Sequence, residues 1–269
     1  MTNVARSLTI AGSDSGGGAG IQADLKTFQE LGVFGMSALT AVTAQNTLGV
    51  QGVYPLDAAS VALQIDSVAT DIGVDAVKTG MLFSAEIIQT VSKKIEEHQF
   101  PHVVIDPVMI AKGGAVLLQD EAVDALKKYL LPMSDVITPN IPEVEVLTGV
   151  KIQSFEDKKK AAQLLFEWGV RNVIIKGGHD ESEYATDILF DGKEFYFYEE
   201  KRIRTKNTHG TGCTFSAAIT AELAKGKPIQ EAVKVGKQFI TAAIACDLQL
   251  GSGHGPTNHW AYNRRGVNV

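Results

Sequence analysis

The chain has 269 residues, of which 45% are hydrophobic and 21% charged, and its formal net charge is −6. An acidic chain without a basic stripe is a poor partner for nucleic acid or an anionic membrane, so we expect a small-molecule ligand. No run approaches the roughly 18 apolar residues that a membrane helix requires. No linker composition divides the chain, and we expect one α/β domain over residues 1–269.

The cysteines and the C-terminal histidines give little sign of a disulfide or a metal site. Cys213 and Cys246 are more than thirty residues apart, and no signal peptide is recognisable, which indicates free thiols in a reducing cytoplasm. Cys246 stands among alanines in the last predicted helix, and we expect it in the core. We interpret His254 and His259, in a glycine-rich tail, as loop residues rather than metal ligands.

The chain opens with strand, glycine loop and helix. Residues 7–12 (SLTIAG) predict a β-strand, residues 13–20 (SDSGGGAG) a loop, and residues 21–32 an amphipathic helix. The dinucleotide motif GxGxxG would require glycine at Ile21, and the Gly-Lys-Ser/Thr of a P-loop occurs nowhere. A tight turn and a ligand-binding loop both remain open interpretations.

The next predicted strand, residues 36–45, is apolar and ends at Gln45. A carboxamide at the end of a buried strand can offer a donor and an acceptor to a heterocycle, where open α/β sheets bind their ligands. It can equally cap the last carbonyls of the strand. Residues 46–56 indicate turns and a short edge strand.

The middle of the chain alternates helices and strands. Residues 57–70 and 84–98 predict helices around a strand at residues 73–82. The apolar run 102–109 indicates a strand buried on both faces, with Asp106 at its end. Because a buried carboxylate is costly unless it is paired, hydrogen-bonded or beside a metal, Asp106 is a candidate for Mg²⁺ binding or for a structural cap.

Residues 111–115 (AKGGA) predict a loop that could cover a nucleotide, and a helix follows near residues 120–130. A further strand is followed by Asn140 and Glu143, where another helix begins. A glutamate in a first helical turn usually compensates the helix dipole, but with Asn140 and Asp106 it can also complete a shell for metal and phosphate.

Two more patterns precede the last motif. Residues 172–178 (NVIIKGG) predict a strand with Lys176 at its end, which is either a charge for phosphate or a surface lysine. Residues 186–200 hold Asp-Gly between two β-rich runs and predict a hairpin at an antiparallel edge.

The stretch NTHGTGCTFSAAITAEL, residues 207–223, joins a glycine turn to an alanine-rich helix. Free N–H groups and the positive end of the helix dipole favour a phosphate there, and they should lower the pKa of the Cys213 thiol. A buried core cysteine is the alternative.

Together these patterns predict strands and helices alternating around a mostly parallel sheet. An anion loop, a carboxylate, an amide and a lysine at its strand ends suggest phosphoryl transfer without a P-loop. The groups at these strand ends are Gln45, Asp106, Asn140, Lys176 and Cys213.

Seven motifs, in this order and over nearly the full length, carry a family resemblance: AGSDSGGGAGIQADLKTF, TAQNTLGV, VKTGML, VIDPVM, ITPNIPE, IKGGH and NTHGTGCTFSAA. The chain resembles the ribokinase-like superfamily and, within it, the bacterial hydroxymethylpyrimidine/phosphomethylpyrimidine kinases. The resemblance implies a three-layer αβα fold with a mostly parallel central sheet and a small antiparallel edge. It also implies a homodimer that uses ATP and Mg²⁺ to phosphorylate 4-amino-5-hydroxymethyl-2-methylpyrimidine and then its monophosphate, for thiamine biosynthesis.

The resemblance also implies roles for individual residues. Those implied to line the pyrimidine pocket are Gly12, Ala19, Gln45, Met81 and Val108. Those implied to serve the ATP phosphates and Mg²⁺ are Asp106, Asn140, Glu143 and Lys176, with Asp106 and Glu143 as metal ligands. Those implied to form the anion hole and the catalytic base are Gly210, Thr211, Gly212 and Cys213, the last standing where many sugar kinases carry aspartate.

Two other functions remain open. Pyridoxal kinases of the same branch share the glycine loop, but TAQNT around Gln45 resembles the pyrimidine kinases. A sensor that binds a pyrimidine or nucleotide without catalysis is the second alternative, although a sensor need not retain a base, metal carboxylates and an anion loop.

Overall fold

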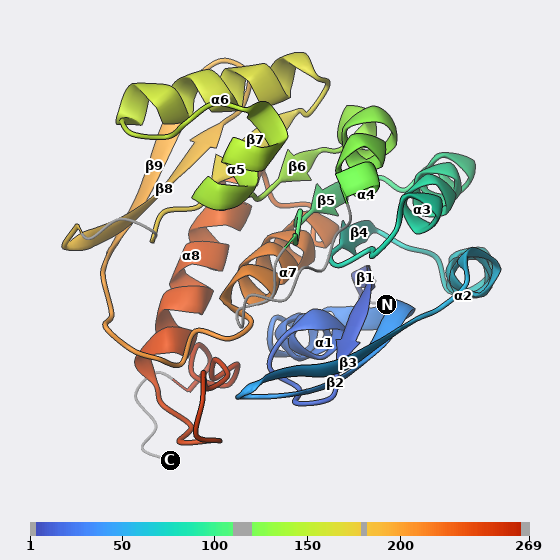
Figure 1. Cartoon of the computed structure of the whole chain (residues 1–269), viewed down its shortest axis with the longest axis horizontal. Coiled ribbons are helices and arrows are strands. Elements are labelled where there is room, and N and C mark those ends of the chain that lie inside the picture. The colour runs from blue at the N-terminus through green and yellow to red at the C-terminus, as the bar shows by residue number, and fades with distance from the viewer. Residues whose placement is uncertain (1–3, 110–119, 179–181, 265–269) are drawn as a thin grey trace.

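A computed structural model describes residues 4–109, 120–178 and 182–264 (Figure 1). The described strands join in one sheet. Their spatial order is β3 (Gly49–Pro55), β2 (Phe34–Asn46), β1 (Arg6–Asp14), β4 (Ala76–Thr79), β5 (Val103–Ile105), β6 (Val136–Ile137), β7 (Asn172–Ile175), β8 (Tyr184–Phe190) and β9 (Phe195–Lys201).

Six neighbouring strands pair in parallel, in the order β2, β1, β4, β5, β6 and β7. The β2–β3, β7–β8 and β8–β9 pairs are antiparallel. The predicted hairpin is therefore confirmed as β8 and β9. Two edges are antiparallel rather than one, because β3 folds back on β2 to form an arm with exposed Leu48 and Tyr54.

Helices cover both faces of the sheet (Figure 1). One layer contains α1 (Gly20–Glu30), α7 (Thr211–Ala224) and α8 (Ile229–Ala245). The other contains α2 (Ala58–Asp71), α3 (Ala85–His98), α4 (Asp120–Ala125), α5 (Ile141–Thr148) and α6 (Phe155–Glu167). The three-layer αβα architecture is thus as expected.

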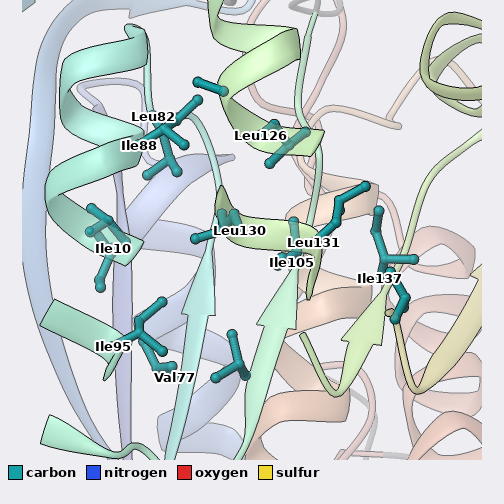
Figure 2. Packing of buried hydrophobic residues seen from close by; sticks show 14 of the residues in the cluster. Ile10, Val77, Leu82, Ile88, Ile95, Ile105, Leu126, Leu130, Leu131 and Ile137 are labelled. Carbon is teal, nitrogen blue, oxygen red and sulfur yellow. The ribbon is translucent and has the colours of Figure 1, made fainter. Parts of the chain in front are cut away.

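Alternate residues of the central strands enter opposite cores. Val103 and Ile105 of β5 pack toward α3 and α4, while Val104 between them packs toward α7 and α8. Figure 2 shows the first of these cores, which includes Ile105 of β5, Ile137 of β6 and Leu130. This burial on both faces explains the continuous apolar runs of the central strands.

The central strands are shorter than their apolar runs. β5 ends at Ile105 and β6 at Ile137, and prolines follow at Pro107 and Pro139. Proline has no N–H for the ladder, and the residue before it is also restricted, so pairing stops near these positions. The strand ends are therefore close to the side chains that form the site.

Two predictions about the C-terminal region are affected by the structure. Cys246 is exposed rather than buried, because α8 ends at Ala245 and the chain turns away. His259 lies in a turn as predicted, but it is buried against α7, with Nε2 3.0 Å from Thr214 Oγ1.

The predicted covering loop at residues 111–115 lies outside the described residues. None of the described helices is both long and apolar enough to cross a membrane.

Candidate active site

A cavity of about 650 Å³ lies at the carboxyl edge of the parallel strands. This is where open α/β sheets place their ligands. The cavity is lined by all the residues that the sequence singles out: Gly12, Ala19, Gln45, Met81, Asp106, Val108, Asn140, Glu143, Lys176, Gly210, Thr211, Gly212 and Cys213.

One end of the cavity holds opposite charges, and we call it the phosphate end, formed by Asp106, Glu143, Lys176 and Gly212. Lys176 Nζ lies 3.1 Å from Asp106 Oδ1 and 3.9 Å from Glu143 Oε2. These residues follow β5, β6 and β7, whose carboxyl ends meet at one edge because the strands are parallel. Asp106 also accepts hydrogen bonds from Thr138 Oγ1 (3.4 Å) and Ser216 Oγ (3.3 Å).

Burial affects the two carboxyl groups differently. It raises the pKa of Glu143 to about 7, because the attraction of Lys176 is too weak to compensate and Asp106 repels the charge. Burial also opposes the charge of Asp106, but Lys176 and Lys78 hold its pKa below the usual range. Near neutral pH Asp106 is therefore ionised and Glu143 is close to half protonated.

Asn140 and Glu143 also have a structural role at the start of α5. Asn140 Oδ1 accepts the N–H of Glu143 at 2.9 Å, and Glu143 Oε2 accepts the N–H of Asn140 at 2.8 Å. This capping box satisfies free N–H groups of the helix. Glu143 therefore compensates the dipole at the start of α5, as expected, and this structural role does not depend on a ligand.

The donors at the phosphate end fit a hard cation. The carboxylates of Asp106 and Glu143 and the nearby carboxamide of Asn140 can supply oxygen ligands. Mg²⁺ is usually held by one or two carboxylates together with substrate phosphates and water. In the described part of the chain, no three His, Cys, Asp or Glu side chains form a dedicated metal cluster. Lys176 lies against both carboxylates, so the protein alone provides only part of a cation shell.

The start of α7 faces the phosphate end directly. Gly210 has a φ of 83°, and a Cβ there would overlap the carbonyl oxygen of Gly18. A Cβ at Gly212 would lie 3.2 Å from Lys176 Nζ and 3.6 Å from Asp106 Oδ2. Neither glycine can be replaced without strain or crowding. Among the described residues no side chain caps this helix, and the N–H of Thr211 donates only a long bond of 3.4 Å to the Thr208 carbonyl. The N–H groups that follow it are thus open to an anion.

The predicted lowering of the Cys213 pKa is wrong for the site without ligand. Burial raises the pKa of this thiol to about 12, although Lys78 and a hydrogen bond from the Gly20 backbone act in the opposite direction. The negative charges of Asp24 and Asp106 add to the rise. Desolvation is therefore stronger here than the helix N-terminus, and Cys213 is a neutral thiol.

A buried ion pair below Cys213 was not predicted. Lys78 Nζ lies 2.9 Å from Asp24 Oδ2, which also accepts from Thr9 Oγ1 at 2.6 Å. Burial opposes the charge of Lys78, but the attraction of Asp24 and Asp106 raises its pKa. A lysine inside the apolar run of β4 was the available sequence signal, because such a position requires a partner.

A second ion pair, between Lys237 of α8 and Asp187 of β8, has an Nζ–Oδ2 distance of 2.9 Å. Asp187 Oδ1 also accepts the N–H of Gly177, next to Lys176, at 2.7 Å. Both members of the pair line the cavity. No local sequence pattern joins a strand of the hairpin to the last helix, so this contact was not predictable.

The other end of the cavity, which we call the heterocycle end, is formed by Asp14, Ala19, Gln45, Met81 and His209. Asp14 accepts the N–H groups of Gly16 (2.8 Å), Gly18 (3.1 Å) and Ala19 (2.8 Å). Its Oδ2 lies 2.7 Å from His209 Nε2. Burial opposes the Asp14 charge, but His209 and these N–H groups lower the pKa of the carboxyl group.

Packing shapes this end of the cavity as well. A Cβ at Gly12 would lie 2.3 Å from the methyl group of Met81, so a larger residue there would have to displace the end of the Met81 side chain. Ala19 and Val108 line the same cavity from the glycine loop and from the segment after β5. Asp14 and His209 were not assigned as site residues from the sequence. The available signal was for Asp14 alone, a carboxylate in the glycine loop that follows the first predicted strand.

In this three-layer αβα fold, one cavity at the carboxyl edge of the sheet contains the N-terminus of α7, the Asp106–Lys176 pair and a separate heterocycle end. These features together define a small-molecule kinase without a P-loop. The chain belongs to the phosphomethylpyrimidine kinase family, whose model matches residues 14–258.

Individual relatives agree with this family. A hydroxymethylpyrimidine/phosphomethylpyrimidine kinase of Bacillus subtilis is 58% identical, over 99% of both chains. The thiamine biosynthesis bifunctional protein ThiED of Geobacter sulfurreducens is 55% identical over 94% of this chain and 51% of its own. The pyridoxal kinase of Staphylococcus aureus, solved with AMP-PCP and pyridoxal, has a TM-score of 0.90 and 42% identity, over 98% of this chain and 96% of its own.

Proposed function

We propose that this chain transfers the γ-phosphoryl group of ATP to 4-amino-5-hydroxymethyl-2-methylpyrimidine and then phosphorylates the monophosphate, a step of thiamine biosynthesis. The observation that carries the proposal is one cavity with Gln45 at the heterocycle end and the Asp106–Lys176 pair facing α7 at the other. The name of the relative at 58% identity supports the same pair of reactions, and the name of the relative at 55% supports thiamine biosynthesis.

The proposed pocket for the ring consists of Gly12, Ala19, Gln45, Met81 and Val108, all of which line the cavity. Gln45 bonds the aminopyrimidine through its carboxamide, while the apolar side chains cover the ring faces. Such a pocket leaves the hydroxymethyl group directed toward Cys213 and the start of α7.

The proposed transfer depends on charge neutralisation more than on a strong base. The hydroxymethyl oxygen attacks the γ-phosphorus, the bond to ADP breaks, and the hydroxyl proton passes to Cys213. The thiol is neutral in the site without ligand, so it must lose its own proton after the substrates bind before it can accept this one. The N–H groups of Thr211 and Gly212 and the ammonium of Lys176 stabilise the transferred phosphoryl. Because the transition state is loose, positioning and neutralisation supply most of the acceleration.

Asp106 and Glu143 are the proposed ligands of Mg²⁺, with Asn140 next to them. When bound, the cation would neutralise charge on the nucleotide phosphates. Lys176 is then the group that exchanges its carboxylate partners for phosphate oxygens. The oxygen donors support this assignment, and so does the preference of Mg²⁺ for few protein ligands.

The direct test is substrate-dependent ADP release by purified protein with Mg²⁺ and ATP. We expect the specificity constant for the hydroxymethylpyrimidine to exceed that for pyridoxal. A clear preference for pyridoxal would replace the proposed function by pyridoxal kinase. ADP release with neither compound would favour a sensor that binds without catalysis.

Pyridoxal kinase is the second candidate because a pyridoxal kinase with bound pyridoxal shares 42% identity with this chain. Both substrates carry a hydroxymethyl group on an aromatic ring of similar size. A dual activity is compatible with one cavity, and the ratio of the two specificity constants measures it.

We also propose that residues 1–269 form one kinase domain, which acts as a homodimer in the cytoplasm. The β2–β3 arm exposes Val42, Leu48 and Tyr54, an apolar surface suited to a second copy. Both cysteines are free, as a reducing compartment requires. Light scattering at twice the 28.8 kDa chain mass would support the dimer.

A further inference from the structure

His209 lies between the glycine loop and Gln45, and three contacts hold it there. A Cβ at Gly18 would lie 2.6 Å from His209 Cδ2, so the imidazole packs directly on this glycine. The backbone N–H of His209 donates to the Gly255 carbonyl (3.1 Å), and its carbonyl accepts from Thr257 (3.3 Å). The backbone of His209 is thus held by the C-terminal segment, and its imidazole packs on the glycine loop.

Asp14 determines which nitrogen of His209 carries a hydrogen. An ionised carboxylate only accepts hydrogen bonds, so His209 Nε2, at 2.7 Å from Asp14 Oδ2, must donate. The same nitrogen lies 3.4 Å from the terminal atom placed as Gln45 Nε2. His209 Nε2 has one hydrogen, which Asp14 holds at 2.7 Å and which only an acceptor at Gln45 could share, because two N–H donors cannot bond each other. The contact therefore favours the oxygen of Gln45 on the side of His209.

Thr43 gives an independent result at the opposite side of the carboxamide. Its hydroxyl hydrogen is donated to the Ser13 carbonyl at 2.7 Å. The same hydroxyl lies 3.2 Å from the other terminal atom of Gln45 and can only accept there. This atom must therefore carry hydrogens. Both neighbours therefore favour the same orientation, with the NH₂ group of Gln45 toward Thr43 and its oxygen toward His209. This orientation is reached by rotating the terminal carboxamide by 180°, which exchanges its oxygen and nitrogen.

We infer that His209 is a positioning residue that fixes the Gln45 carboxamide with its oxygen toward the imidazole and thereby sets specificity for an aminopyrimidine. Asp14 supplies the fixed donor on His209, and Thr43 completes the pair of contacts. This inference rests on the proposed function, because it assigns Gln45 to the recognition of the heterocycle.

The fixed carboxamide leaves one N–H and one oxygen lone pair for a ligand. A 4-aminopyrimidine offers a ring nitrogen acceptor next to an amino donor, so it can form two parallel bonds with a carboxamide. In pyridoxal, a methyl-bearing carbon separates the ring nitrogen from the hydroxyl group, which prevents the same paired contact. A freely rotating carboxamide would discriminate less, because it could adapt to either ring.

The kinetic test compares His209→Leu, which removes the donor, with His209→Gln, whose amide nitrogen can replace it. The substrates are the hydroxymethylpyrimidine and its analogue without the 4-amino group. We expect His209→Leu to lower kcat/KM about ten-fold for the amino compound, mainly through KM, and about two-fold or less for the analogue. His209→Gln should restore the ratio between the two substrates. Equal losses for both substrates in His209→Leu would overturn the inference.

A double variant tests whether His209 acts through Gln45. If it does, His209→Leu should cause almost no further loss in a Gln45→Ala background. Additive losses would contradict the inference.

Nitrogen NMR of the ligand-free protein tests the same inference without any turnover. We expect His209 to carry a hydrogen on Nε2 at neutral pH. We also expect His209→Leu to shift the side-chain amide signal of Gln45 but not that of exposed Gln51. A hydrogen on Nδ1 alone would overturn the inference. Failure of the wild-type enzyme to phosphorylate the pyrimidine would overturn the proposed function and leave this result intact.

Discussion

The two ends of the cavity hold their buried carboxylates in different ways. Asp14 at the heterocycle end has contacts of 2.7 to 3.1 Å with His209 and three backbone N–H groups. Asp106 at the phosphate end has contacts of 3.1 to 3.4 Å with Lys176, Ser216 and Thr138. The first carboxylate is fully engaged, whereas the second is only loosely paired.

This difference indicates how the site divides its work. A carboxylate with four close donors fixes the glycine loop before a ligand arrives, which limits the entropy lost on binding. A loosely paired carboxylate beside a lysine can exchange partners when phosphate and cation arrive. The heterocycle end is therefore preorganised for its ligand, whereas the charged side chains of the phosphate end can exchange partners when phosphate and cation bind.

Removing the thiol between the two ends should have the largest effect. We expect Cys213→Ala to lower kcat by about 10²- to 10⁴-fold, the range for a positioned general base, while ATP still binds. Steady-state turnover and nucleotide titration measure the two effects. Cys246→Ala, which removes an exposed thiol, is the matched control. Unchanged turnover in Cys213→Ala would remove this cysteine from the mechanism.

Lys176→Met tests the charge at the phosphate end. The variant leaves Asp106 without its ammonium partner and removes a positive charge from the phosphoryl group, so we expect kcat to fall about 10²- to 10³-fold. The affinity for the pyrimidine should stay within a factor of about three, since the heterocycle end is separate. Lys193→Met, at an exposed lysine, is the control. Equal losses of pyrimidine affinity and kcat would contradict the division between the two ends.

Lys78→Met tests the buried Asp24–Lys78 pair, whose lysine lines the cavity. Leaving Asp24 as an uncompensated buried charge should lower the free energy of unfolding by about 3–5 kcal/mol. Thermal or denaturant unfolding measures this change. Adding Asp24→Asn should recover part of the loss, because the unpaired charge is then absent. A stable Lys78→Met protein would mean that water reaches this pair.

The smallest effect should be a pH dependence that comes from Glu143. Its pKa is raised to about 7, above the unfolded value of about 4.3, so the folded state binds more protons between these values. Stability should thus fall as pH rises from about 4.3 to 7, while activity rises if the ionised group binds Mg²⁺. Glu143→Gln should remove both trends. Parallel pH profiles of the two proteins would contradict the assignment.

Much of the fold follows from local patterns. Apolar runs marked the strands. The helix predicted over residues 84–98 is α3, and the hydroxyl of Ser84 caps its start by accepting the N–H of Ile87 at 3.3 Å. The short edge strand predicted within residues 46–56 is present as β3, but its antiparallel pairing with β2 was not predicted, because these residues carry little period-two signal. The exposure of Cys246 depends on where α8 ends, and alanines continue the helical pattern without marking that end.

Site residues could be predicted from the sequence where a single polar residue stands at the end of a predicted apolar strand. Asp106, Asn140 and Lys176 were found in this way, and the structure brings them to one cavity. The Asp24–Lys78, Asp187–Lys237 and Asp14–His209 pairs were not found, since each joins segments far apart in the sequence. The pKa of Cys213 was misjudged because burial depends on the tertiary structure, whereas the helix N-terminus is visible in the sequence.

The most direct test of the account is to follow the pyrimidine itself by phosphorus NMR or mass spectrometry, with purified protein, ATP and Mg²⁺. The account predicts that the monophosphate of 4-amino-5-hydroxymethyl-2-methylpyrimidine appears first and is then converted into the pyrophosphate by the same protein. Both products should fall together in Lys176→Met, because one phosphate end serves both steps. Absence of both products from the pyrimidine, with pyridoxal phosphorylated under the same conditions, would contradict it.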